Sequence, residues 1–184
     1  MIFFNFGSDG ATAGAQTFYF DDIAVVGGAV PDPFPAITFD DPAVTYSLRG
    51  FGGAEDSMIV ADPADAGNQV VQVNRADNAE VFAGTVVWTG PNESVPVIPL
   101  DAMNTTMSVR TWSPSAFITV RLKIENSSNP AVSVETEAVT SVGGAWETLT
   151  FDFANDFQKI LTMVSDIPIF IKIFHQVANP FYRK

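Results

Sequence analysis

Three pairs of carboxylates lie close together in this sequence and are the first residues that could perform chemistry. They are Asp21 with Asp22, Asp40 with Asp41, and Glu135 with Glu137. Hydrolysis of a glycosidic bond requires two carboxyl groups roughly 5–9 Å apart across a cleft, but nothing in the sequence builds a cleft around any pair. The single histidine, His175, lies in a C-terminal segment of different composition, so a Ser–His–Asp arrangement has no credible member. We therefore expect a protein that is not an enzyme.

Aromatic and arginine side chains are the second group that could form a site. Sugars present apolar C–H faces ringed by hydroxyls, so a sugar site needs an exposed aromatic platform beside polar side chains. In TMSVRTWS (106–113), alternation places Arg110 and Trp112 on the polar face of a strand, and in WETLTFDF it places Trp146 on the polar face. Each aromatic residue has the alternative of belonging to the core or its rim. The candidate sugar-binding residues are Tyr46, Arg49, Arg75, Phe82, Trp88, Arg110 and Trp112, with Arg110–Trp112 and Arg75–Phe82 as the favoured pairs.

Composition narrows the classes of partner. The 184 residues include 9 Lys and Arg against 21 Asp and Glu, a formal net charge of −12. This balance argues against nucleic acid and anionic membrane surfaces, because no basic stripe is present to neutralise phosphates. Asp166, Pro168 and Lys172 interrupt the C-terminal apolar run, so we expect no membrane insertion. The sequence has no cysteine, and MIFFNFGSDG lacks the basic region and cleavage pattern of a signal peptide.

Short apolar or alternating runs, separated by turn sequences such as GFGGAED and ENSSNP, indicate β-strands throughout most of the chain. The predicted strands are residues 2–6, 17–26, 36–41, 57–61, 69–74, 80–88, 106–113, 116–125, 132–139 and 146–154. Helix signals are weak before residue 155. The pattern predicts an all-β protein, an antiparallel β-sandwich of the jelly-roll type, with a divergent C-terminal tail.

Alternation also predicts which side chains of a strand face the core. In ITVRLKIE (118–125) the apolar side chains point one way, and Arg121, Lys123 and Glu125 point the other. A hairpin through NSSNP sets Arg121 near Glu137 and Lys123 near Glu135. These charges form either a polar strip that faces a ligand or a solvated ladder of ion pairs, and we favour the ladder.

Two long stretches resemble a known family. They are the run from ITFDDPAVTYSLRGFGG to NAEVFAGT, and the run from SVRTWSPSAFITVRLKIENSSN to GGAWETLTFDFAN. Together they resemble, over roughly residues 36–155, a β-sandwich carbohydrate-binding module of galactose-binding-like fold. Such modules accompany laminarinase-like glycoside hydrolases and surface glycan-binding proteins of marine bacteria. Phe82 stands where family members often carry Trp, which weakens stacking and leaves the ligand preference open.

The resemblance implies a function and a location. The chain is expected to bind a polysaccharide without cleaving it, with a β-glucan such as laminarin as the first expectation. It is expected to be secreted or on the cell surface, next to neighbouring modules of a larger protein. The alternative is a structural or adhesion spacer in a repeat array without a ligand, which requires Tyr46, Trp88 and Trp112 to be buried.

The order of the segments departs from the order in the family. IFFNFGSDGATAGAQTFYFDDIAVVGG is similar to the family's closing strands, yet here it precedes the body. The resemblance implies four segments: closing strands (1–28), a proline-rich linker (29–35), the main body (36–155) and a divergent tail (156–184). Either the chain is a piece of a tandem array, which we favour as its origin, or its N-terminal strands fold back as in a circular permutant. A linker of about ten residues, GGAVPDPFPA, reaches roughly 30 Å, which suffices for the second arrangement.

The resemblance further implies a structural calcium ion. Related modules commonly hold Ca²⁺ where the first and last strands run side by side, and the aspartates of FDDI (20–23) and FDD (39–41) fall at those places. Carboxylate oxygens are the ligands that Ca²⁺ prefers. Asp22 and Asp40 are the favoured ligands, with Asp21 and Asp41 as further candidates. The alternative is that these aspartates are ordinary turn and strand-edge residues.

Overall fold

The computed structural model describes residues 1–27, 34–126, 129, 131–156 and 169–170. Most of the predicted linker (29–35), nearly all of the predicted tail (156–184) and His175 lie outside the described residues. Within the described part, no helix has the length and apolar character needed to cross a membrane.

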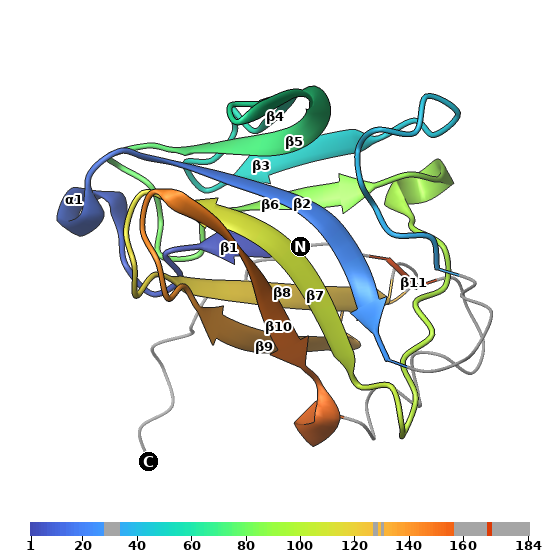
Figure 1. The fold of residues 1–184 in the computed structure, drawn as a ribbon. Coiled ribbons are helices and arrows are strands. Elements are labelled where there is room, and N and C mark those ends of the chain that lie inside the picture. The colour runs from blue at the N-terminus through green and yellow to red at the C-terminus, as the bar shows by residue number, and fades with distance from the viewer. Residues whose placement is uncertain (28–33, 127–128, 130, 157–168, 171–184) are drawn as a thin grey trace, which may run out of the picture.

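The described chain forms two antiparallel sheets that pack face to face as a β-sandwich (Figure 1). Sheet A contains β1 (Ile2–Phe4), β3 (Ser47–Phe51), β6 (Gly84–Trp88), β8 (Thr119–Asn126), β9 (Ser133–Val139) and β11 (Ile169–Phe170). Sheet B contains β4 (Met58–Asp62), β5 (Asp65–Arg75), β2 (Gln16–Val26), β7 (Thr106–Ser113) and β10 (Ala145–Asp152), hydrogen-bonded from edge to edge in this order. The helical elements are the short α1 (Gly10–Ala13), η1 (Pro91–Glu93) and η2 (Ala154–Asp156). The predicted all-β antiparallel sandwich is confirmed.

Most of the predicted strands coincide with observed ones, and two regions differ. The segment 36–41 is not a strand: Ile37 makes only an isolated bridge to Ile23, and Phe39 adopts a left-handed φ of 61°. β3 was not predicted, because the turn sequence GFGGAED hides the pairing of Ser47–Phe51 with β6. Both differences are at places where tertiary contacts outweigh local pattern.

The core lies between the sheets and is rich in phenylalanine. Phe4 of β1 stacks on Phe18 of β2 with ring centroids 4.7 Å apart, and Phe20 packs beside them. Phe151 of β10 is also fully buried. The predicted inward faces of β7, β8 and β10 are buried, which confirms the assignment of faces by alternation.

The N-terminal strands occupy central positions in both sheets. β1 lies between β8 and β6 in sheet A, and β2 lies between β5 and β7 in sheet B (Figure 1). β1 and β11 both pair antiparallel with β8, β1 at Val120–Leu122 and β11 at Glu125–Asn126. The N-terminal strands therefore complete the sandwich of their own chain, and β2 supplies the middle of the face described next.

Candidate functional site on the outer face of sheet B

A row of aromatic side chains crosses the outer face of sheet B. Alternation in β2 turns Phe18 and Phe20 into the core and leaves Tyr19 on the outside. The register pairs Tyr19 with Trp112 of β7 and Trp112 with Trp146 of β10, so the three rings come from three adjacent strands. The centroid of Tyr19 lies 5.5 Å from that of Trp112 and 6.3 Å from that of Trp146. All three rings are half-buried, so each keeps an accessible surface.

Two loops turn this aromatic row into a groove. Pro63 and Ala64, at the tip of the β4–β5 hairpin, form one wall, and Gly144 and Ala145, before β10, form the other. The enclosed space is about 290 Å³, and its surface is predominantly apolar. Gly144 adopts a φ of 71°, a left-handed conformation that favours glycine and keeps the second wall free of a side chain. We call this space the aromatic groove.

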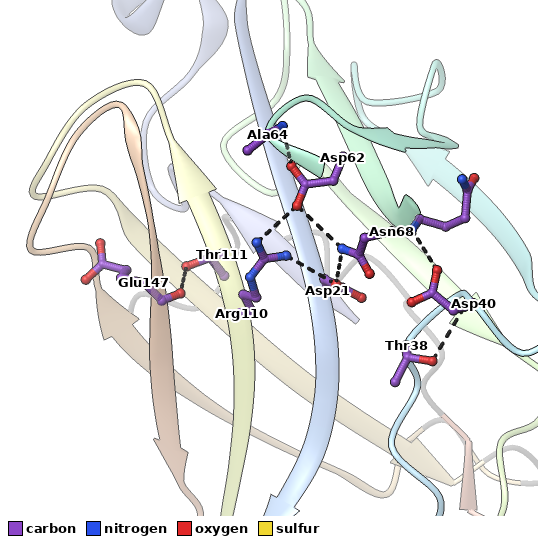
Figure 2. A network of polar contacts seen from close by, with 10 residues as sticks. Asp21, Thr38, Asp40, Asp62, Ala64, Asn68, Arg110, Thr111 and Glu147 are labelled. Carbon is purple, nitrogen blue, oxygen red and sulfur yellow. Dashed lines mark hydrogen bonds and ion pairs between the residues drawn. The ribbon is translucent and has the colours of Figure 1, made fainter. Parts of the chain in front are cut away.

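A polar network fixes the hairpin tip over the sheet (Figure 2). Arg110 of β7 donates through Nη1 to Asp21 Oδ2 at 3.3 Å and through Nη2 to Asp62 Oδ2 at 3.0 Å. Asn68 donates to Asp21 Oδ2 at 3.0 Å, and the backbone N–H of Ala64 donates to Asp62 Oδ1 at 2.8 Å. Asp62 and Asn68 lie at the two ends of the hairpin tip, so the network holds the wall of the groove against β2 and β7.

The pKa values of Asp21 and Asp62 shift in opposite directions. Burial raises the pKa of Asp21 to about 6, against the hydrogen bond from Asn68 and the charge of Arg110. Asp21 Oδ1 is buried and has no hydrogen-bond partner within the described part of the chain, which explains why burial dominates over the ion pair. Burial would also raise the pKa of Asp62, but hydrogen bonds from Ala64, Arg110 and Asn68 together hold that pKa below its ordinary value. Asp21 is thus the least satisfied member of the network.

Arg110 links the network to the aromatic groove. Its guanidinium carbon lies 3.8 Å from the ring centroid of Trp146, a cation–π contact. Because Nη1 and Nη2 are engaged with Asp21 and Asp62, the guanidinium orients Trp146 and the hairpin tip. Arg110 therefore positions the groove, and the direct sugar contact that the sequence suggested for it stays a prediction.

The structure brings together Arg110, Trp112 and Asp21 from the predicted residues. Of the remaining sugar candidates, Tyr46, Phe82 and Trp88 pack against the hydrophobic core as partly buried residues. Arg49 forms a bidentate ion pair with Glu93 at 2.7 and 3.0 Å on β3. These four side chains are not among the residues that line the aromatic groove, and their binding to a sugar stays a prediction.

Arg75, the remaining sugar candidate, is buried beneath the beginning of β2. Its Nη2 donates to the carbonyl oxygens of Ser8 and Glu80. Its favoured partner in the sequence interpretation, Phe82, packs on the core. Arg75 thus connects, by hydrogen bonds, the backbone segments that contain Ser8 and Glu80.

The four aspartates predicted to bind calcium make separate contacts. Asp21 belongs to the network, Asp40 accepts a hydrogen bond from the backbone of Gln69 at 2.7 Å (Figure 2), and Asp41 accepts one from Ala43 at 2.8 Å. Asp22 is exposed at a φ of 48°. No group of three or more Asp, Glu, His or Cys side chains in the described ranges is arranged to hold a metal ion. The four carboxylates do not form such a group, and the calcium site stays a prediction.

Sequence reasoning did not select Tyr19, Trp146, Asp62 or Asn68 as site residues. Trp146 was placed on the polar face, and the alternation of TFYFDDI contains the same signal for Tyr19. Asp62 and Asn68 fall within DPADAGN, which indicates a turn and carries no sign that the turn folds back over the sheet.

Comparison with known proteins identifies no relative of this chain. No family model, no curated protein and no solved structure matches the chain. Its site is accordingly interpreted from its own geometry.

Proposed function

We propose that the protein is a non-catalytic carbohydrate-binding module that holds a polysaccharide in the aromatic groove. The observation that carries this proposal is the row of Tyr19, Trp112 and Trp146, half-buried side by side on a sheet face with a groove above them. Aromatic rings stack on the apolar C–H faces of sugars, and an apolar groove with a few fixed polar groups is the usual form of a small-ligand site. A β-glucan such as laminarin is the first ligand to test, on the basis of the family resemblance.

The family resemblance extends the proposal to the whole protein. The central positions of β1 and β2 support a sandwich of the circularly permuted kind, in which segments similar to closing strands fold back into the same chain. On this proposal the chain belongs to a secreted or cell-surface protein with neighbouring modules. Weak binding by one module would gain from repetition of modules through effective concentration.

A structural spacer is the second candidate function. Tyr46 and Trp88 support it, because both pack against the core as partly buried residues. Trp112 opposes it, because its ring lines the aromatic groove. The two functions therefore differ in what Trp112 does.

Affinity gel electrophoresis of two tryptophan variants tests the proposal. Laminarin, mixed-linkage glucan, agarose and alginate would be cast into native gels, with Ca²⁺ and with chelator. We expect one of the neutral polysaccharides to retard the wild type, and Trp112→Ala to lose that retardation while circular dichroism shows it folded. The chelator arm tests the calcium prediction independently, through loss of thermal stability.

Trp88→Ala is the matched control. It removes the same side chain from sheet A, where the ring packs against the core, so it should lower the melting temperature and leave retardation unchanged. Retardation of no polysaccharide by the folded wild type would favour the spacer. Loss of retardation in Trp88→Ala alone, with the variant folded, would place the sugar on sheet A and overturn the assignment of the groove.

A further inference from the structure

A second pocket lies at the end of sheet B where β2 begins, next to the loop between β3 and β4. It encloses about 290 Å³ and is lined by polar side chains, among them Gln16, Thr17, Asn74, Glu55 and Asp56. We call it the end pocket. No site prediction from the sequence includes it, apart from Arg75 at its lining.

The end pocket reaches the face that carries the aromatic groove through Thr17 and Asn74, whereas Gln16 and Arg75 of its lining lie on the opposite side of β2 and β5. Thr17 and Tyr19 are two residues apart on β2 and point to the same side, since Phe18 between them is fully buried. Their cross-strand partners on β5, Asn74 and Gln72, share that side. Residues two apart on a strand are separated by about 7 Å. Thr17 of the end pocket and Tyr19 of the aromatic groove are thus neighbours along β2, and a short oligosaccharide can span the distance between them.

The end pocket offers both hydrogen-bond donors and acceptors. Asn74 Oδ1 accepts a hydrogen bond from the Thr17 hydroxyl at 3.0 Å, and Gln16 Oε1 accepts one from Asn5 Nδ2 at 3.0 Å. With their oxygens engaged, Asn74 and Gln16 present their amide NH₂ groups as donors. The carboxylates of the same pocket supply acceptors.

Those carboxylates differ in how firmly they are held. Glu55 accepts the backbone N–H of Gly53 at 2.9 Å, whereas Asp56 is exposed and makes no hydrogen bond to the described residues. Asp56 is therefore the acceptor most available to a ligand. Alternating donors and acceptors suit hydroxyl groups, because each hydroxyl both donates and accepts.

The charge of the end pocket selects against anionic ligands. Two exposed carboxylates, Glu55 and Asp56, line it. The one cation among its lining residues, Arg75, is buried; its Nη2 donates to Ser8 and Glu80, and its Nε and Nη1 have no hydrogen-bond partner among the described residues. A uronate or sulfated sugar would be repelled by Glu55 and Asp56. A neutral, polyhydroxylated ligand fits both the charge and the donor–acceptor pattern.

We propose that the end pocket is a second subsite, which binds sugar units of the same neutral polysaccharide chain whose other units stack in the aromatic groove. This inference rests on the proposed function. The protein then distinguishes oligosaccharides by their length. A short oligosaccharide contacts only the aromatic row of the groove, whereas a longer one also forms hydrogen bonds in the end pocket. Affinity therefore rises with length until both pockets are filled.

Isothermal titration calorimetry with graded oligosaccharides tests the second subsite. The probes are laminarin oligosaccharides from disaccharide to heptasaccharide, with mixed-linkage oligosaccharides of the same lengths as a second series. The variants are Asp56→Ala, the double variant Asp56→Ala/Asn74→Ala, and Glu135→Ala as a control that removes one carboxylate from the outer face of sheet A. Asp56→Ala removes no side-chain hydrogen bond or ion pair among the described residues, so this variant is expected to keep the fold even where the double variant does not.

The expected result is a loss that appears only with longer probes. Two lost hydrogen bonds weaken the longest oligosaccharide by about tenfold in the double variant, and one weakens it severalfold in Asp56→Ala. The shortest probe that binds should have equal affinity for all four proteins, and Glu135→Ala should match the wild type throughout.

Three outcomes would overturn the inference and leave the proposed function standing. They are equal affinity of the variants and the wild type for every length, an equal loss at every length, and tighter binding of an alginate oligosaccharide than of a neutral one of the same length. Failure of the proposed function is recognised separately, as retardation that survives Trp112→Ala.

Discussion

The outer faces of the two sheets use the same set of residue types with different consequences. On sheet A, Arg121 stacks over Phe6 at 3.6 Å and pairs with Glu135 and Glu137. On sheet B, Arg110 stacks over Trp146 at 3.8 Å and pairs with Asp21 and Asp62. Each arginine thus joins one aromatic ring to two carboxylates, and the ring in the sheet B arrangement, Trp146, lines the aromatic groove.

Burial is what separates the two arrangements. The side chains of Glu135 and Glu137 are 43% and 41% exposed, whereas those of Asp21 and Asp62 are 2% and 0% exposed. The β4–β5 hairpin tip excludes water from the second pair, and no such cover lies over the first. Exposed ion pairs contribute little to stability, while a buried charge becomes costly as soon as its partner is removed. The same residue types therefore give a solvated ladder on one sheet and a rigid support for a site on the other.

Replacement of Arg110 by alanine tests this difference most strongly. Arg110→Ala leaves Asp21 and Asp62 buried without a cation, and it also removes the contact with Trp146. We expect the free energy of unfolding to fall by about 3–5 kcal/mol. Urea denaturation at neutral pH, followed by tryptophan fluorescence and circular dichroism, measures the loss.

A conservative variant separates charge from geometry. Arg110→Lys keeps one positive charge but cannot reach both carboxylates with a planar fork, so it should recover only part of the lost stability. A loss below about 1 kcal/mol for Arg110→Ala would show that the network on sheet B is as solvated as the ladder on sheet A.

The pH dependence of stability gives a second, smaller difference between the faces. Burial raises the pKa of Asp21 to about 6 in the folded state, above the ordinary value of 3.8. Between these values the folded state binds more protons than the unfolded state, so the contribution of Asp21 to stability is most favourable at low pH and decreases as pH rises toward 6. Asp21→Asn removes this contribution. From pH 4.5 to pH 7 the variant should therefore gain roughly 2 kcal/mol of unfolding free energy relative to the wild type.

The measurement compares two variants at two pH values. Urea unfolding of the wild type, Asp21→Asn and the control Glu137→Gln at pH 4.5 and pH 7 isolates Asp21, because each variant lacks one carboxylate, buried in one case and exposed in the other, and the remaining carboxylates are common to all three proteins. A variant that instead loses stability relative to the wild type as pH rises would mean that the ion pair with Arg110 dominates over burial.

The contrast between the faces also shows what the sequence could predict. Period-two alternation identified the inward residues of β7, β8 and β10 and placed Trp112 and Trp146 on the outside, because these strands obey a local geometric rule. The predicted register of the β8–β9 hairpin is confirmed, because Arg121 lies opposite Glu137 and Lys123 lies opposite Glu135. Lys123 nevertheless forms its ion pair with the buried Glu125 of its own strand.

The parts that could not be predicted depend on contacts between distant segments. Asp62 and Arg110 are separated by 48 residues and meet only because the β4–β5 hairpin tip folds over sheet B. A turn sequence predicts that the chain reverses its direction, but tertiary packing determines over which face of the sheet the hairpin tip lies. The seven sugar candidates were chosen by residue type, and only Arg110 and Trp112 lie at the groove, because residue type does not distinguish an aromatic ring on the core from one on a binding face.

Replacement of Arg121 by alanine should have the smallest effect and completes the comparison. Arg121→Ala removes a cation–π contact and two exposed ion pairs, and neither Glu135 nor Glu137 is left buried. We expect a loss of about 1 kcal/mol in urea denaturation at low salt, and a smaller loss at 1 M NaCl, where the exposed pairs are screened. Arg110→Ala should lose nearly the same stability at both salt concentrations, because its carboxylates are shielded from ions. A salt dependence as large for Arg110→Ala as for Arg121→Ala would mean that the hairpin tip opens in solution, and the wall of the aromatic groove would then be formed only when a ligand holds it in place.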